Sequence, residues 1–224
     1  QRLGLDLQGG TNIVLQADLS KVPEDQHKDA MTALLRNIER RVNAYGVAEP
    51  VIYQQGADRI AVQLAGVRDV EEAKRLIGRT AQLVFKERTI GPDGQPQDKD
   101  LDLTGADLKR AYASIEPTLN QPVVNFEFND RGAQIFADAT ARLAPTRGQI
   151  AIYLDNELLT APLVDEPIPS GRGYIRGGFT MDSARTLAIQ LNAGALPVPV
   201  SVILEQNVDA TLGADSIRKS ILAG

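Results

Sequence analysis

The stretch VIYQQGADRIAVQL, residues 51–64, decides the fold predicted for this chain. Two short runs rich in β-branched residues flank a turn-forming Gly-Ala-Asp sequence at residues 56–58, which predicts a β-hairpin. Three apolar residues of the second run recur at every second position and are expected to point inward: Ile60, Val62 and Leu64. The segments on either side of this hairpin then decide the topology.

Each side of the hairpin carries a predicted helix. Before it, apolar residues recur with a helical period between Pro23, which suits a first helical position, and Gly46, which suits the position after a helix end. This apolar stripe consists of Met31, Leu34, Leu35, Ile38, Val42 and Tyr45. After the hairpin, Asp69 is followed by Glu72 at the spacing of a capping box, which predicts the start of a second helix.

Two further strands are predicted outside these helices: TNIVLQAD at residues 11–18 and AQLVFKER at residues 81–88. Both are short and rich in apolar residues, as strands are. The order strand, helix, strand, strand, helix, strand is the ferredoxin-like pattern, in which two helices cover one face of an antiparallel sheet.

Residues 89–102, TIGPDGQPQDKDLD, interrupt this pattern because they combine Gly, Pro and charge, and they are predicted to form a loop at a subdomain boundary. A second unit of helices and strands is predicted to follow. Its expected elements are a short helix from Thr104 through Tyr112, a strand at 123–128, a helix capped by Asn129, a hairpin turning at Asp155-Asn156, a strand at 174–179, and a helix capped by Thr180 and ended by Gly194.

Residues 199–206, PVSVILEQ, return to strand character after the second unit. This strand could pair within the second unit or return to the first sheet, and the second choice would make the middle of the chain an insertion. We favour the insertion. The expected fold class is therefore α+β, with a ferredoxin-like antiparallel base sheet that has helices on one face, plus an inserted α+β head subdomain.

Composition and charge exclude several classes of function. The chain has 224 residues, of which 24 are Lys or Arg and 29 are Asp or Glu, so its net charge is 24 − 29 = −5. Nucleic acid is not an expected partner, because phosphate binding needs a concentrated basic surface. Aromatic residues make up 4% of the chain and there is no Trp, which leaves few rings to stack on bases.

Residues that could carry catalysis or bind a metal are scarce. There is one histidine, His27, and no cysteine, so a histidine-based triad and a zinc site are not expected. Asp98, Asp100 and Asp102 resemble the start of a calcium loop, but Leu103 stands where that loop needs Gly. We therefore predict no enzyme activity, no metal, no cofactor and no small-molecule substrate.

The chain is expected to be a piece of a longer protein, because it starts at Gln1 without Met and stops in SILAG without a helix cap. Its longest weakly polar stretch, residues 193–204, is far shorter than the roughly 20 residues that span a bilayer.

Two segments resemble the SecD family of bacterial protein-export subunits. GLDLQGGTNIVLQ, residues 4–16, is similar to the Gly-Leu-Asp-Leu-x-Gly-Gly signature of that family, carried here by Gly4, Leu5, Asp6, Leu7, Gly9 and Gly10. Leu7 favours SecD over its partner SecF, which usually has Phe there. Residues 194–224 look like the segment that leads into the second transmembrane helix of SecD, and VNAYGVAEPVI, LIGRTAQLVF, LTGADL and TAPLV between them are similar too.

The resemblance implies a periplasmic domain that lies between the first and second membrane helices and consists of a base and an inserted head. Carried over, the base covers residues 3–88 and 192–212, the head covers 89–191, and residues 213–224 lead into a transmembrane helix. Gly9 and Gly10 would permit a tight backbone. Gly and Pro at the two crossings would suit a hinge, at Thr89, Gly91, Pro92, Gly194 and Pro197.

The resemblance also implies a function. The family acts in the inner membrane with SecF, assists the SecYEG channel, and completes the export of unfolded secretory preproteins with the proton-motive force. Its proton-carrying carboxylates lie in membrane helices that this sequence lacks. The head would capture the emerging polypeptide, and the candidate contact residues are Tyr153, Leu158, Tyr174 and Phe179.

Two other readings remain open. A porter-like domain of a small-molecule or lipid exporter would have a defined apolar pocket. A purely structural module that docks to the channel would have an exposed patch and would not bind free polypeptide. The signature at residues 4–10 favours the export domain over the porter.

Overall fold

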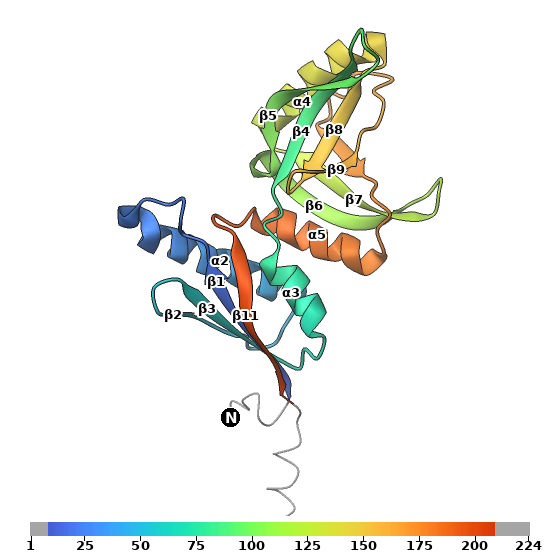
Figure 1. Cartoon of the computed structure of the whole chain (residues 1–224). Helices are drawn as coiled ribbons and strands as arrows, with labels where there is room; N and C mark the ends of the chain where they lie inside the picture. The colour runs from blue at the N-terminus through green and yellow to red at the C-terminus, as the bar shows by residue number, and fades with distance from the viewer. Residues whose placement is uncertain (1–8, 209–224) are drawn as a thin grey trace, which may run out of the picture. The chain divides into compact units, whose positions relative to one another are not determined.

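The computed structural model describes residues 9–208, and it divides into two compact units. Unit 1 is built from residues up to Thr80 together with those from Leu196 onward, and unit 2 comprises Ala81–Ala195. The chain therefore passes between the units twice, at 80–81 and at 195–196. In Figure 1 the blue N-terminal strand and the red C-terminal strand lie side by side in unit 1, and unit 2 is the green to orange part between them in sequence.

Unit 1 contains one four-stranded sheet in the order β11-β1-β3-β2, in which every neighbouring pair is antiparallel. Its strands are β1 (Gly10–Ala17), β2 (Val51–Gln55), β3 (Arg59–Ala65) and β11 (Val200–Val208). The predicted hairpin at residues 51–64 is confirmed as β2 and β3. Ile60, Val62 and Leu64 are buried as expected.

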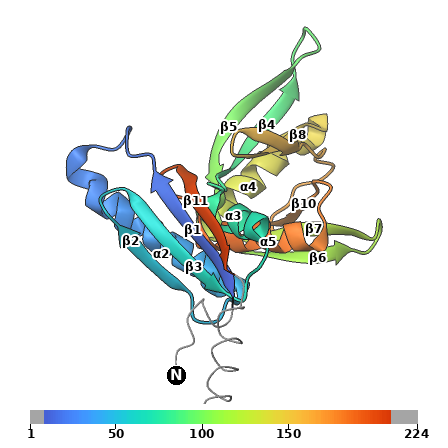
Figure 2. The same ribbon diagram turned by 60° about the horizontal axis from the view of Figure 1, so that its bottom comes forward.

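Two helices of unit 1 pack against this sheet, α2 (His27–Tyr45) and α3 (Val70–Gly78), with a short 3-10 turn (Glu24–Gln26) before α2. The predicted end of α2 and the predicted start of α3 are confirmed, whereas Pro23 precedes the 3-10 turn and is not the first residue of α2. Gly46 follows α2 with φ 91°, and the Asp69 side chain accepts a hydrogen bond from the Glu72 N–H at the start of α3. The resulting sheet, with helices packed against it and seen from below in Figure 2, has the ferredoxin-like strand order.

One predicted strand belongs to the other unit. Residues 81–88 were expected to supply the fourth strand of the base, but β4 (Leu83–Ile90) pairs with β5 (Pro96–Thr104) and β8 (Gln149–Leu154) in unit 2. The fourth strand of the base is β11, which pairs with β1 along its length. The physical reason is the apolar face of β4: Leu83 and Phe85 are buried in the core of unit 2. The unit boundaries consequently lie at 80/81 and 195/196 instead of 88/89 and 191/192.

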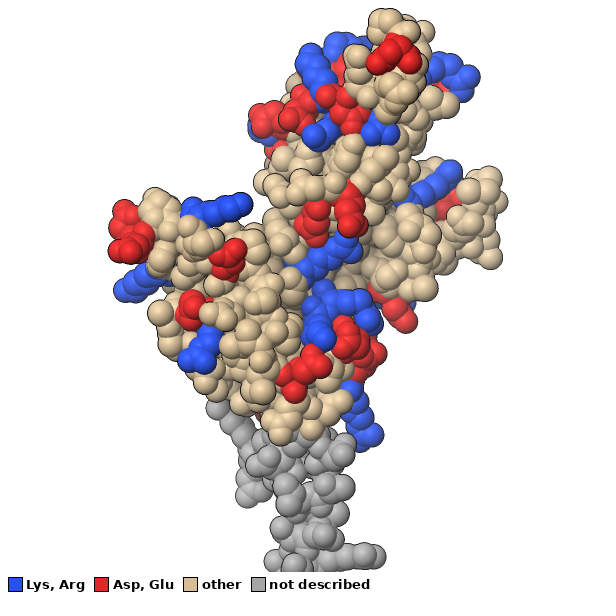
Figure 3. Space-filling view, viewed as in Figure 1, with Lys and Arg blue, Asp and Glu red and all other residues tan. Residues whose placement is uncertain are grey.

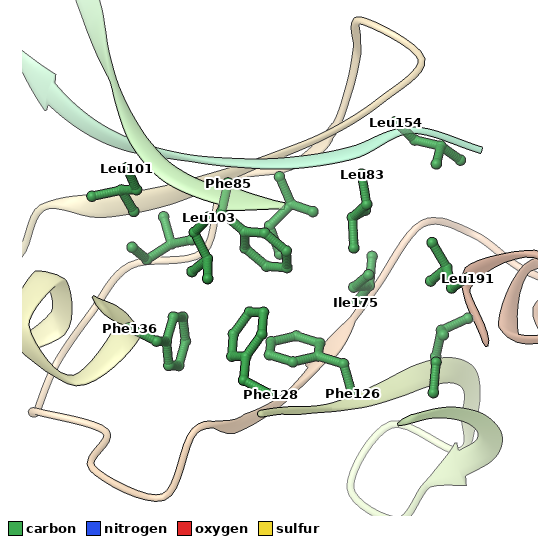
Figure 4. Packing of buried hydrophobic residues seen from close by; sticks show 14 of the residues in the cluster. Leu83, Phe85, Leu101, Leu103, Phe126, Phe128, Phe136, Leu154, Ile175 and Leu191 are labelled. Carbon is green, nitrogen blue, oxygen red and sulfur yellow. The ribbon is translucent and has the colours of Figure 1, made fainter. Parts of the chain in front are cut away.

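Unit 2 has two antiparallel sheets around one core. The first has the order β10-β7-β6, from Arg172–Ile175, Gln121–Phe128 and Leu108–Glu116; the second has the order β5-β4-β8-β9, where β9 is Glu157–Thr160. Its helices are α4 (Asp130–Leu143) and α5 (Met181–Ala193), with 3-10 turns at Gly105–Asp107 and Ala144–Thr146. Four phenylalanine rings meet in the core, with centroids 5.0 to 6.0 Å apart in each contacting pair (Figure 4): Phe85, Phe126, Phe128 and Phe136.

Local signals in unit 2 predicted several elements correctly. Asn129 caps α4 by accepting from the Gly132 N–H, and Thr180 forms a capping box with Ser183 at the start of α5. Asp155 and Asn156 both have positive φ, as a two-residue hairpin turn requires, and they join β8 to β9.

Three local predictions in unit 2 are wrong. Residues 89–102 form most of the β4–β5 hairpin instead of a loop. The expected helix from Thr104 is a single 3-10 turn, after which the chain enters β6 and pairs with β7. The expected strand at 174–179 has the wrong bounds, because it is β10, Arg172–Ile175, and residues 176–179 lie outside it. In the first two cases a neighbouring strand satisfies backbone groups that local composition could not assign.

A buried arginine holds the end of α3 in unit 1. Arg41 of α2 has 0% exposure, and its guanidinium donates to the carbonyls of Leu76, Ile77, Arg79 and Thr80. The C-terminal carbonyls of a helix have no partner within the helix, so a buried helix end needs such a donor. The Thr80 carbonyl also accepts from the Leu196 N–H at 2.9 Å, which joins the two passages of the chain on the side of unit 1.

We predict that Arg41→Met lowers the free energy of unfolding of unit 1 by about 2 to 4 kcal/mol, because it removes the hydrogen bonds that a buried guanidinium donates to carbonyls at the end of α3. The exposed neighbour on the same helix, Arg36→Met, is the control and should cost less than about 0.5 kcal/mol. Urea unfolding read by hydrogen exchange at the β1 amides reports on unit 1 alone. Equal effects of the two substitutions would show that the guanidinium does not hold the helix end.

Candidate functional site

Unit 2 contains an apolar cavity of about 220 Å³ between its two sheets. One side is formed by Phe126 of β7 and by Gly173 and Tyr174 of β10. The other side is formed by Ile150 and Ile152 of β8, by Thr160 at the end of β9, and by residues 162–164 after it. Figure 4 shows part of the core beside it, where Phe126 and Phe136 both turn their rings inward.

The rim of the cavity carries two large exposed side chains. Leu163 is 51% exposed and Tyr174 is 43% exposed. The charged residue on the lining is Arg176, whose guanidinium lies 5.1 Å from the centre of the Tyr174 ring and donates to its hydroxyl at 2.9 Å. Such a lining can hold apolar side chains by burial and dispersion, and it offers no pair of groups for acid–base chemistry.

Gly173 is required where β10 lines the cavity. A Cβ atom at this position would lie 2.6 Å from Cζ of Phe126, so the ring packs directly against the β10 backbone. Any side chain at residue 173 would clash with this ring, which explains the glycine.

Tyr174 lines this cavity, but Tyr153 does not. Tyr153 lies beside the β4–β5 hairpin, where its hydroxyl donates to Asp98 at 2.5 Å and accepts from Arg88 at 2.9 Å. Lys86 lies 5.3 Å from the centre of its ring. The bond to Asp98 raises the pKa of the Tyr153 hydroxyl. Leu158 pairs with Tyr153 across β8 and β9 and so shares its face of the sheet, where it is 45% exposed.

Phe179 is partly buried. It packs against the core of unit 2, and its ring lies close to Gly177. The sequence did not point to Pro162, Leu163, Val164 and Ile168 as cavity residues, because this segment lies outside the named strands and shows no periodicity. The only available signal was the TAPLV segment, which resembles the family but suggests no role.

The structure also places the remaining predicted positions. Thr89, Gly91 and Pro92 lie in the β4–β5 hairpin, so the chain does not pass between the units there. Gly194 and Pro197 lie on either side of the passage at 195–196, and their role as a hinge stays a prediction.

Four residues of the predicted signature, Gly4 through Leu7, lie outside the described residues. Its two glycines are described: Gly9 has φ 70° and its carbonyl accepts from the Gly66 N–H, and Gly10 begins β1 with φ 150°.

Within residues 9–208, no group of three or more His, Cys, Asp or Glu side chains could hold a metal ion. In the same range, no helix is both long and apolar enough to cross a membrane. On the face shown in Figure 3, basic and acidic side chains are interspersed.

Comparison with protein families identifies three matching regions. A model described as the P1 head subdomain of SecDF matches residues 83–198. A model of the N-terminal part of the P1 domain of protein translocase subunit SecDF matches residues 31–89, and a model of the SecD/SecF GG motif matches residues 2–18.

Curated relatives match the chain over nearly its full length. Protein translocase subunit SecD of Dictyoglomus turgidum is 41% identical over 223 residues, covering 100% of this chain and 53% of the relative. The same subunit of Acidaminococcus fermentans is 45% identical over 221 residues, covering 98% of this chain and 50% of the relative. The chain therefore spans about half the length of these relatives.

Solved structures share the fold. The crystal structure of SecDF in a super-membrane-facing form superposes with a TM-score of 0.77 at 33% identity, covering 98% of this chain and 33% of that one. A second structure, described as that of a membrane component SecDF that enhances protein export, has a TM-score of 0.69 at 31% identity and covers 86% of this chain and 98% of that one.

The ion pair beside Tyr153 generates a pH prediction. Arg88 donates to Asp98 at 2.7 and 2.9 Å, and this bond, with a further one from Tyr153, holds the pKa of the Asp98 carboxyl below its ordinary value of 3.8. A carboxyl whose folded-state pKa is lowered stabilises the folded protein above its ordinary pKa, and that stabilisation is lost as the pH falls through the lowered value.

We therefore predict that Asp98→Asn lowers the stability of unit 2 by about 1 to 3 kcal/mol near neutral pH, and that the difference from the unsubstituted chain shrinks as the pH falls below about 4. Asp165→Asn removes the exposed ion pair with Arg147 and should cost less than about 1 kcal/mol. The measurement is urea unfolding across pH, and a difference that does not vary with pH would contradict the prediction.

Proposed function

Because this chain belongs to the SecD family of protein translocase subunits, in which it corresponds to the P1 domain, we propose that it is the periplasmic domain of a Sec export accessory subunit and that unit 2 holds emerging unfolded preprotein. The parent protein would act in the inner membrane with SecF and the SecYEG channel. It would help to complete translocation with the proton-motive force.

The observation that carries the proposal is the apolar cavity of unit 2. An unfolded chain exposes apolar side chains, and burying one of them contributes about 1.5 to 3 kcal/mol. Leu163 and Tyr174 offer exposed apolar surface at the rim, and Ile150 and Ile152 line the interior. Burial has no direction and needs no particular sequence, so such a site binds many polypeptides weakly.

Weak and unspecific binding suits an export accessory better than tight binding. A chain in transit must be held and then released, which requires a coupling of the bound state to a second conformation. We propose that the two passages, at 80–81 and 195–196, are where unit 2 can change its orientation. No chemical reaction is needed for this role, and we propose a non-enzymatic function.

Two alternatives are less well supported. A porter of small molecules would need a mostly apolar pocket of about 300 to 1,000 Å³ to enclose its ligand. The apolar cavity of unit 2 is about 220 Å³, and the larger hollow beside Leu163, of about 470 Å³, is lined partly by Arg88, Arg147 and Gln149. A docking module would bind the channel but no free polypeptide. The match to the P1 head subdomain over residues 83–198 favours the export role over the porter.

We predict that a photo-crosslinking residue placed at Leu163 or at Tyr174 of the full-length protein captures a secretory precursor stalled in export. Both side chains lie at the rim of the cavity. Tyr153 and Leu158 are the matched controls, because they lie in the same unit on a face that does not line the cavity. Crosslinks from the rim should require ongoing export and should exceed those from the control positions.

Capture of channel subunits alone from the rim positions would instead support a docking scaffold. Equal capture from the rim and control positions would show that the cavity is not the contact. Either result would end the proposed role of the cavity in holding preprotein.

A further inference from the structure

The cavity of unit 2 is bordered by an open strand edge. In the part of the chain that the structure describes, β10 pairs with β7 on one side and with no strand on the other. Gly173 and Tyr174 of β10 line the cavity. An unpaired strand edge presents backbone N–H and C=O groups that can bond to a further strand.

The register shows which residue of β10 faces outward. The Phe128 N–H donates to the Gly171 carbonyl at 2.9 Å, so these two residues are a hydrogen-bonded pair of the antiparallel ladder. Such pairs alternate with pairs that exchange no bonds. Gly173 therefore bonds toward β7, and the N–H and C=O of Tyr174, opposite Asn125, point away from β7 along the free edge.

On the opposite wall of the cavity, the backbone groups of Leu163 also point away from the neighbouring strand. The Ile150 N–H donates to the Pro162 carbonyl at 3.1 Å, and the Val164 N–H donates to the Gly148 carbonyl at 2.8 Å. These two bonds flank Leu163, which forms an isolated antiparallel bridge with β8. The N–H and C=O of Leu163 itself therefore point away from β8. Both walls of the cavity thus carry a residue with outward-pointing backbone groups.

Two other sheet edges of unit 2, at β6 and at β5, are protected. At the far edge of the β10 sheet, the Asn192 side chain of α5 bonds to both the N–H and the C=O of Ala111 on β6, at 2.7 and 2.8 Å. The edge strand β5 carries charged side chains at Asp98, Lys99, Asp100 and Asp102. Side-chain caps and charges of this kind prevent the addition of a strand. On β10, the charged side chain of Arg172 pairs with Glu127 of β7, and within the described residues no side chain caps the backbone of Tyr174.

We propose that an extended segment of unfolded polypeptide enters the cavity as an additional β-strand, bonded through its backbone to Tyr174 of β10 and on its other side to Leu163. This inference rests on the proposed function and specifies how the polypeptide is recognised. Backbone bonding is common to all sequences, and the cavity receives every second side chain of the added strand. The pairing thus gives affinity without sequence specificity.

The test uses a fluorescent peptide of about eight residues, alternating Val and Thr with Lys at both ends, and a copy that is N-methylated at every second residue. Methylation removes backbone donors and leaves the side chains and their apolar surface in place. We expect the methylated copy to bind the 224-residue chain about tenfold more weakly or worse in fluorescence anisotropy. The unmethylated peptide should also slow hydrogen exchange at the Tyr174 and Leu163 amides.

The outcomes separate the inference from the proposed function. Equal binding of the two peptides would overturn strand addition and leave apolar capture by the cavity in place. Failure of both peptides to bind would overturn the proposed function as well. Pairing of two copies through β10, detected by sedimentation without peptide binding, would also overturn the inference.

A pair of substitutions at one position provides a second test. Tyr174→Pro removes the side chain and the outward N–H, and an edge strand tolerates proline where the N–H has no partner in the sheet. Tyr174→Ala removes only the side chain. If strand addition is correct, Tyr174→Pro weakens binding of the unmethylated peptide about fivefold or more beyond Tyr174→Ala. Equal binding by two variants with the same circular dichroism spectrum would contradict it.

Discussion

The antiparallel pairing of β11 with β1 is the constraint on which the rest of the structure depends. It joins Gly10 to Val208, so a sheet begun at the start of the described chain is completed only near its end. The chain must therefore leave unit 1 after α3 and return to it before β11. This requirement makes unit 2 an insertion, and it brings the two passages together where the Leu196 N–H bonds to the Thr80 carbonyl.

Arg41 stabilises unit 1 at the point where the chain passes from α3 into unit 2. A helix that ends inside a packed unit leaves carbonyls without partners, and a buried guanidinium supplies several donors in one rigid group. The same residue therefore satisfies the end of α3 and holds the chain up to Thr80, the last residue before unit 2. The last residues of unit 1 before unit 2 are therefore held in place by contacts within unit 1.

The candidate site lies where an edge strand of unit 2, β10, borders the apolar cavity. Charged residues on β5 and the Asn192 amide beside β6 protect two edges, whereas the Tyr174 backbone of β10 borders an apolar cavity without a side-chain cap. An unprotected edge is a liability in most proteins because it invites association with other chains. In a domain of a protein translocase subunit, association with an extended chain is the proposed activity, so the same feature becomes useful.

The sequence by itself determined the four α-helices and most of their ends, the hairpins at residues 51–64 and at Asp155-Asn156, and the family, because each depends on residues close together in the chain. Asp69, Asn129, Thr180 and the Asp155-Asn156 turn act within a few positions of themselves. Only the tertiary structure decided that β4 joins unit 2, that residues 108–116 form a strand, and that Tyr174 lines the cavity while Tyr153 binds Asp98. Alternation along a strand specifies its two faces, but its partner is chosen by the burial of distant residues, which no local pattern encodes.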